Sequence, residues 1–267
     1  MKTEKKILSK EVISWAFYDW ANSAFATTVI AGFFPIFFKS FWANSLSDTE
    51  STALLGLANS LSGFFILIFA PFLGALADIT FRKKYMLVFF MLIGAGSTAS
   101  FFFIYEGYWM IAVIAYILAS IGFSGGNIFY DSLIIDVSND QSRNQVSAFG
   151  YAMGYLGGGI LFVVNVLMYL QPNIFGLASE IDAVLFSFLS VAIWWSIFTL
   201  PLIKFVKERK GEITSLSLTS TVKNSFFRVI NTFKEIRQYK NLFYFLVAYW
   251  LYMDGIDTVV RLSLIHI

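Results

Sequence analysis

An apolar stretch near the N-terminus carries the side chains best suited to chemistry. Residues 14–35 read SWAFYDWANSAFATTVIAGFFP, a run long enough to cross a bilayer, for which about 20 residues suffice. On a helix, six side chains share one face: Trp15, Asp19, Asn22, Ser23, Ala26 and Thr27. A carboxylate in hydrocarbon costs about 2.5–3.5 kcal/mol on insertion scales, so it needs a polar partner or a water-filled cavity. This face is therefore expected to point into the protein and to line a cavity for a substrate or an ion.

The composition identifies the elements that would surround this face. Of the 267 residues, 58% are hydrophobic and only 13% are charged, whereas soluble domains carry about 25% charged residues. The chain is therefore an integral membrane protein of the all-α class. Charged residues divide it into apolar blocks of spanning length, which predict seven spans: 12–38, within 53–77, within 85–105, within 107–130, within 146–170, 183–203, and one from about 241 onward.

The distribution of basic residues predicts the orientation. All but Lys39 and Arg261 of the 19 lysines and arginines fall in the N-terminal tail, the loops after the second and fourth spans, and residues 204–240. By the positive-inside rule the N-terminus and the long loop before the seventh span are cytoplasmic. The same rule accounts for the basic residues, so no nucleic-acid partner is implied. We expect a multi-pass protein of a bacterial plasma membrane.

Several classes of chemistry are disfavoured by the residues that are absent. The chain has no cysteine and one histidine, His266, which argues against thiol chemistry, a metal site and a histidine-based triad. No catalytic residue and no cofactor is predicted. An intramembrane aspartyl enzyme is an alternative, but no GxGD motif follows the membrane aspartates. A seven-helix receptor is a further alternative, against which the cytoplasmic N-terminus argues, and no span contains a lysine that could hold retinal.

Further candidate cavity residues occur in the fourth and seventh spans. The fourth predicted span ends with Asn127 and Asp131 on one face, where Asp131 is read either as a cavity carboxylate or as a residue of the cytoplasmic interface. The seventh span contains Asp254 and Asp257. Its segment WLYMDGIDT and the first-span segment WAFYDWANS both fit W-x-x-x-D-x-x-[DN]-[ST], a repeat expected if two six-helix halves lie around one cavity.

Two further motifs indicate how the helices pack and close. Gly150, Gly154 and Gly158 form a GxxxGxxxG ladder in the fifth span, which permits close helix crossing. The segment GALADITFRKK, residues 74–84, resembles the cytoplasmic loop signature G-x-L-A-D-x-x-G-R-[KR] of the major facilitator superfamily, with Phe81 in place of a glycine. That resemblance implies a cytoplasmic gate, with these members: Gly74, Asp78, Arg82 and Lys83.

Four segments together resemble the vacuole-effluxer branch of this superfamily: SWAFYDWANSAFATTVIAGFFPIFF, NIFYDSLIIDVS, SAFGYAMGYLGGG and YWLYMDGIDT. The resemblance covers about residues 11–260. The family usually has an asparagine where Asp131 stands, so the resemblance does not support a shared role for that carboxylate. It implies a carrier of twelve helices, of which seven are visible, and eukaryotic members are implicated in exporting amino acids from the vacuole.

These observations predict a domain layout and a function. Residues 1–11 form a cytoplasmic tail, 12–204 a six-helix half, 205–240 a basic cytoplasmic loop, and 241–267 the start of a second half that is otherwise missing, with residues 262–267 non-native. The predicted function is secondary transport of a small solute by alternating access, with amino-acid efflux and proton coupling as hypotheses. The bilayer, the solute and protons are the expected partners. The alternative for the chain as given is an inactive fragment of such a transporter.

Overall fold

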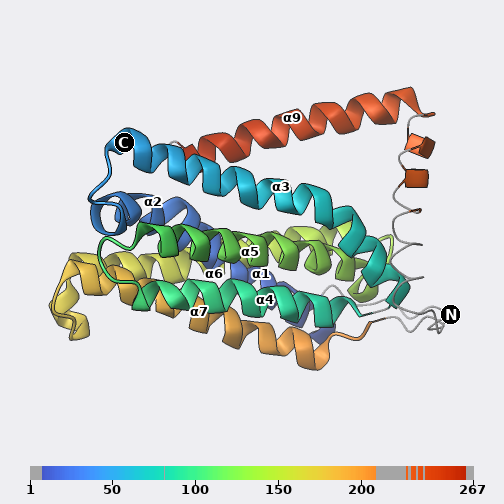
Figure 1. Ribbon diagram of the computed structural model, residues 1–267. Coiled ribbons are helices and arrows are strands. Elements are labelled where there is room, and N and C mark those ends of the chain that lie inside the picture. Colours follow the sequence, from blue (N-terminus) through green and yellow to red (C-terminus); the bar gives the residue numbers. More distant parts are fainter. Residues whose placement is uncertain are drawn as a thin grey trace.

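The computed structural model describes residues 8–80, 82–208, 227, 230–232, 234–236 and 238–262, and within these ranges it does not describe the side chains of residues 75, 76, 78–80, 254 and 257–262. In this part of the chain every regular element is a helix. Six helices are long and apolar enough to cross a membrane, and they lie roughly side by side in Figure 1. The first six predicted spans are thereby confirmed as helices.

The first span is a continuous helical stretch whose hydrogen-bonding pattern changes along its length. It comprises α1 (Lys10–Ala24), the π-helical η1 (Phe25–Phe33), α2 (Phe34–Phe37) and the π-helical η2 (Phe38–Trp42). Ser9 caps its start by accepting a hydrogen bond from the Val12 amide. π-Helical turns inside α-helices are rare and frequently occur at functional sites. The irregular segment η1 of this helix contacts α6 and α7.

The other five spans are α-helices joined by short turns. They are α3 (Asp48–Thr80), α4 (Lys83–Ser100), α5 (Trp109–Val137), α6 (Arg143–Leu170) and α7 (Glu180–Phe205). The 3₁₀ turns η3 (Phe101–Phe103) and η4 (Pro172–Phe175) follow α4 and α6. The turns after them contain Gly107 and Gly176, whose φ angles of 82° and 72° lie in the region that favours glycine.

One predicted boundary is wrong. The fourth span was expected to end at Asp131, but α5 continues to Val137 and includes Asp136. The charged residues after Tyr130 suggested an end because charge usually marks the edge of a span, whereas Asp136 is buried here against Lys83. Consequently Asp131 and Asp136 are both helical, and their positions relative to the bundle are set by the same helix.

The helix α1 packs against several other helices of the bundle. The first helix packs mainly against α6 and α7, and α5 packs against α3 and α4. At the end of the bundle remote from Lys10, a buried aromatic cluster fixes the helices, with the Phe34 and Tyr116 rings stacked at 4.3 Å. Within the bundle, Asn165 is fully buried and bonds to Thr28 and Ser190, which ties the first span to α6 and α7.

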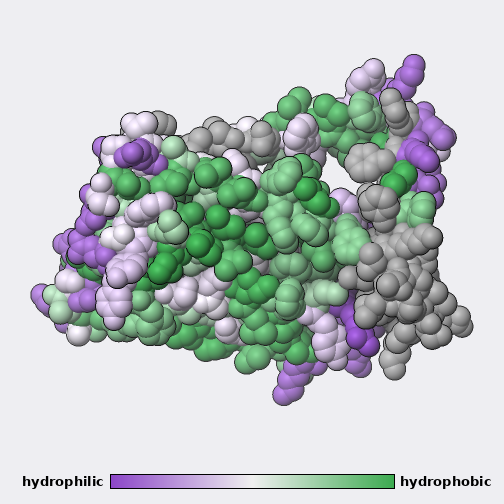
Figure 2. Space-filling model, in the orientation of Figure 1, coloured by the Kyte–Doolittle hydropathy of each residue, from purple (hydrophilic) through white to green (hydrophobic). Residues whose placement is uncertain are grey.

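The surface of the bundle agrees with a membrane setting. Figure 2 shows hydrophobic residues over the middle of the visible face and hydrophilic residues towards its two ends. The predicted seventh helix exists as α9 (Lys240–Leu262), which lies at the edge of the molecule beyond α3 in Figure 1. Its described side chains are all exposed, and it is not among the six apolar spans. Its crossing of a membrane therefore stays a prediction, and most of residues 205–240 lie outside the described residues.

Candidate functional site

The predicted polar face of the first span packs on the glycine ladder of α6. A Cβ added at Gly154 would lie 2.8 Å from both Asp19 Cγ and Ser23 Oγ, and one at Gly158 would lie 2.9 Å from the Ser23 carbonyl oxygen. Thr27 Oγ1 donates a hydrogen bond of 3.1 Å to the Gly158 carbonyl across the same crossing. The close helix crossing predicted for this ladder is present, and it brings the Asp19 face directly against α6.

Two side-chain hydrogen bonds organise the polar residues of this face. Ser23 Oγ donates to Asp19 Oδ1 at 3.0 Å, one helical turn away. Asn22 Nδ2 donates to Asn127 Oδ1, which joins α1 to α5. Asn22 is buried, whereas Asp19, Ser23 and Asn127 are half-buried. Asn22 and Asn127, predicted from separate spans, are thus in direct contact.

A cavity of about 340 Å³ opens beside these residues. Its lining comes from α1, α5 and α6: Trp15, Asp19, Asn127, Tyr130, Asp131, Ile134, Ser147 and Tyr151. Four of the residues proposed from the sequence therefore share one cavity, including Asp131. Asp131 lies among the lining residues of this cavity, and α5 continues beyond it to Val137. Its two readings, a cavity carboxylate and a residue of the interface, both stay predictions. Of these eight lining residues none is a lysine, arginine or histidine.

An aromatic stack forms one wall of this cavity. The rings of Trp15 and Tyr130 are 4.3 Å apart and inclined by only 8°, and Trp15 Nε1 donates a hydrogen bond of 3.0 Å to the Tyr130 carbonyl oxygen. Gly150 lies against both rings, since a Cβ there would be 2.7 Å from each side chain. The hydrogen bond and the contact with Gly150 together hold the stack, so its position in the cavity wall is well defined.

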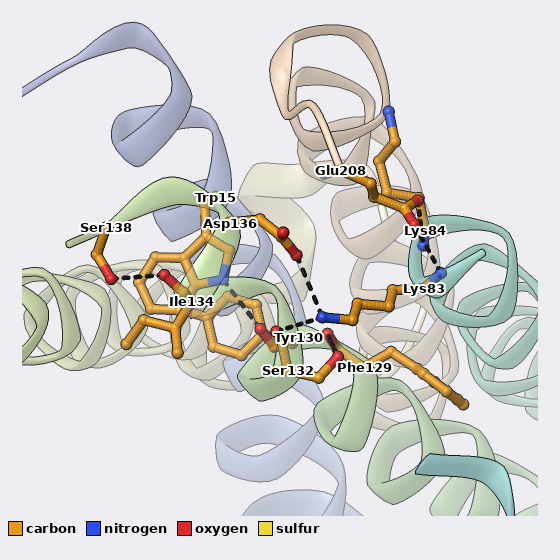
Figure 3. Close-up of polar contacts among 10 residues, drawn as sticks. All are labelled: Trp15, Lys83, Lys84, Phe129, Tyr130, Ser132, Ile134, Asp136, Ser138 and Glu208. Atoms are coloured by element: carbon orange, nitrogen blue, oxygen red, sulfur yellow. Dashed lines mark hydrogen bonds and ion pairs between the residues drawn. The ribbon is translucent and has the colours of Figure 1, made fainter. Parts of the chain in front are cut away.

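A second polar cluster lies near one end of the bundle, around the start of α4. Lys83 Nζ is 3.3 Å from Asp136 Oδ2 and donates a 3.0 Å hydrogen bond to the Ser132 carbonyl oxygen, as Figure 3 shows. The exposed fractions of the Lys83 and Asp136 side chains are 8% and 3%. Two opposite charges are buried together here, which satisfies the requirement that a buried charge be paired.

Glu208 completes this cluster from the end of the sixth span. Its carboxylate accepts hydrogen bonds of 2.9 Å from the backbone amides of Lys83 and Lys84, at the N-terminus of α4 where anions are favoured. In return, Lys84 Nζ donates to the carbonyl oxygens of Ile203 and Val206 at the end of α7. Figure 3 shows Glu208 beside the two lysines. The start of α4 and the end of α7 thus cap each other.

The residues predicted for a gate are only partly brought together. Lys83 is in the cluster, while Arg82 is exposed and Gly74 has open space where a Cβ would lie. The side chains of Asp78, Asp254 and Asp257 lie outside the described residues, so their predicted roles stay predictions.

The sequence analysis missed two members of the cluster, Asp136 as a partner of Lys83 and Glu208. One signal was available for Glu208. The N-cap of the helix that begins at Lys83 is Arg82, not a Ser, Thr, Asp or Asn. The first backbone N–H groups of this helix therefore needed a hydrogen-bond acceptor from another part of the chain. Within the part of the chain that is described, no group of three or more His, Cys, Asp or Glu side chains is placed so that it could hold a metal.

Comparisons with known proteins place this arrangement in context. The chain is 39% identical over 263 residues to an uncharacterized MFS-type transporter from Bacillus subtilis, covering 97% of this chain and 60% of that protein. It is 27% identical to autophagy-related protein 22 from Yarrowia lipolytica, over 43% of this chain and 22% of that protein. The chain therefore spans about 60% of the length of the Bacillus subtilis relative.

A solved structure shows the same fold. The xylose transporter XylE from E. coli, in an inward-open conformation, aligns with a TM-score of 0.54 at 16% identity, covering 88% of this chain and 55% of that one. The Bacillus subtilis relative is named as a transporter, in agreement with the prediction that the chain is not an enzyme. The profile of the family described as "Vacuole effluxer Atg22 like" matches residues 45–266. This chain, with its six spans of the major facilitator type, belongs to the vacuole effluxer Atg22-like family.

Proposed function

We propose that the protein carrying this chain is a secondary transporter that moves a small solute by alternating access. The observation that supports this most is the cavity at the α1–α5–α6 junction, where Asp19 and Asp131 share about 340 Å³ with polar and aromatic side chains. Acidic side chains within membrane spans are costly and typically mark substrate or ion pathways. A structural role alone would have paired both carboxylates, as the chain does for Asp136.

The proposal includes an orientation. The positive-inside rule places the N-terminus, the start of α4 and the loop of residues 205–240 on the cytoplasmic side of a bacterial plasma membrane. The cluster of Lys83, Asp136 and Glu208 then lies at the cytoplasmic end of the bundle. Since it ties α4, α5 and the end of α7 together, it would keep these helices moving as one body during a transport cycle.

The proposed domain layout makes residues 12–204 one half of the carrier and α9 the first helix of the other. In this layout Asp254 and Asp257 would face the cavity from the second half, as the W-x-x-x-D repeat suggests. The identity of 39% to a longer MFS-type transporter supports a second half in the complete protein. The cavity described here would then be one wall of the complete pathway.

Amino-acid efflux coupled to protons is the specific form of transport that we propose. The family description supports efflux, and a half-buried Asp19 in contact with Ser23 is a suitable group to take up and release a proton as the cavity opens and closes. A carboxyl that meets solvent on one side of the membrane and then on the other can bind a proton on one side and release it on the other. Alternation between the two environments would couple proton movement to solute movement.

The test is transport by the full-length protein in reconstituted vesicles with an imposed pH gradient. Asp19→Asn is expected to abolish the pH-driven flux of amino acids, because the amide cannot carry a proton. Asp140→Asn, which changes an exposed carboxylate outside the cavity, is the matched control and is expected to transport normally. Undiminished pH-driven flux in the Asp19→Asn variant would reject proton coupling through this residue.

A further inference from the structure

The cavity contains a carboxylate for which the described part of the chain supplies no partner. The Asp131 side chain is exposed to the cavity, and among the described residues no hydrogen bond or ion pair of its carboxylate is found. Asp19, in contrast, is half-buried and accepts a hydrogen bond from Ser23. The two carboxylates are therefore not equivalent: one is held by the protein, and the other is open to a ligand.

The charge of the lining determines what such a ligand can carry. Two carboxylates face one cavity, and the six other lining residues are neutral. In a cavity flanked by low-dielectric protein, two acidic groups produce a negative potential that attracts cations and repels anions. The part of a ligand that enters this wall should therefore be positively charged.

The aromatic lining indicates what kind of cation fits. Tyr151 is 67% exposed and presents its ring to the cavity beside Asp131, while the Trp15–Tyr130 stack behind it is 2% and 6% exposed and fixed by packing. Aromatic faces attract organic cations, most strongly where water is partly excluded. An inorganic ion would gain little from such a wall, whereas an alkylated ammonium group would contact both the ring and the carboxylate.

We propose that the wall formed by Trp15, Tyr130, Asp131 and Tyr151 binds the ammonium group of an organic substrate. This deepens the proposed transport function and rests on it, because it assigns a substrate class to the same cavity. Asp131 pairs with the positive charge, Tyr151 covers the alkyl substituents, and the buried stack provides a rigid surface behind them. Any remaining part of the substrate would be held by other walls of the pathway.

The test is equilibrium binding of choline to the purified chain in detergent micelles or nanodiscs, measured by ligand-observed NMR. The comparison compound is 3,3-dimethylbutan-1-ol, an uncharged molecule of the same shape. Choline is expected to bind and the alcohol to bind at least about tenfold more weakly, since only choline has the charge that the carboxylate and the ring recognise. Equal binding of the two compounds, or no binding of choline, would overturn the proposal.

Variants locate the binding within the cavity. Asp131→Asn is expected to weaken choline binding about tenfold or more, Tyr151→Ala to weaken it severalfold, and Tyr151→Phe to leave it nearly unchanged because the ring is kept. Asp140→Asn removes an exposed carboxylate outside the cavity and so controls for a general loss of negative charge. Choline affinity unaffected by Asp131→Asn, or reduced equally by Asp140→Asn, would contradict the assignment.

This experiment separates the two proposals. Binding is measured at equilibrium without a pH gradient, so it does not depend on coupling through Asp19. Suppose that Asp19→Asn loses pH-driven flux while Asp131→Asn binds choline as tightly as the unchanged chain. The transporter proposal would then stand, and the proposal of an ammonium site would be rejected. Choline binding that requires Asp131, in a protein with no flux of any kind, would leave an organic-cation site without the proposed transport.

Discussion

Two carboxylates five residues apart on α5 have opposite environments. Asp136 is buried at 3% exposure against Lys83, whereas Asp131 faces the cavity without a described partner. The same helix thus carries one carboxylate that serves the fold and one that is available for a ligand. The difference arises from the neighbours: α4 supplies a lysine at the level of Asp136, whereas the lining residues of the cavity at Asp131 include no basic side chain.

The environments of Asp136 and Asp131 illustrate two ways in which a membrane span can accommodate a charged residue. A buried ion pair is weak evidence for added stability, but breaking it by removing one partner is costly. An acidic residue in a water-accessible cavity carries little such penalty. The Asp136 region should therefore be sensitive in stability, and the Asp131 region should be sensitive in binding.

The largest expected effect comes from Lys83→Met. This change removes a positive partner of the buried Asp136 carboxylate, and breaking a buried ion pair in this way typically costs about 3–5 kcal/mol. We expect a markedly lower midpoint of thermal unfolding in detergent. Lys39→Met removes a lysine of η2, far along the same bundle, and is expected to leave the midpoint nearly unchanged. Equal midpoints for Lys83→Met and the wild type would show that the pair does not stabilise the fold.

The sequence predicted the spans and the glycine crossing because both follow from local patterns. Apolar length and the Gly150–Gly154–Gly158 spacing are read along one helix, and the structure has the six helices and the close approach of Asp19 to Gly154. The contact of Asn22 with Asn127 joins residues 105 positions apart. Each was a candidate by itself, but their pairing depends on how α1 and α5 are rotated, which no local pattern specifies.

The polar cluster was harder to predict for a related reason. Glu208 caps a helix that begins 125 residues earlier, and Asp136 was expected beyond the end of its span. Charge near a span suggests an interface, and only the neighbouring helices reveal that Lys83 makes burial possible. For Asp131 the sequence left an interface position and a cavity position open, and the structure adds that it lines the cavity on a helix that runs on to Val137.

An intermediate effect is expected where packing positions the Asp19 side of the cavity. Gly154→Ala would place a methyl group 2.8 Å from Asp19 Cγ and Ser23 Oγ, so either these side chains move or the helices separate, and overpacking of this kind costs about 1–3 kcal/mol. Gly159→Ala is the matched control on the same helix, because nothing lies within 4 Å of its added Cβ. Thermal unfolding of the two variants should differ clearly; identical midpoints would mean that the crossing tolerates a larger separation.

The smallest effect on stability is expected for Asp131→Asn. Because the carboxylate is exposed and has no described partner, its replacement by an isosteric amide should change the free energy of unfolding by less than about 0.5 kcal/mol. Asp136→Asn on the same helix should lower stability clearly, since it leaves Lys83 at 8% exposure without a full counter-charge. Unfolding curves of the two variants, recorded side by side, measure the contrast directly. If Asp131→Asn destabilised the protein as much as Asp136→Asn, its carboxylate would be serving the fold, and a loss of choline binding in that variant would no longer identify a ligand contact.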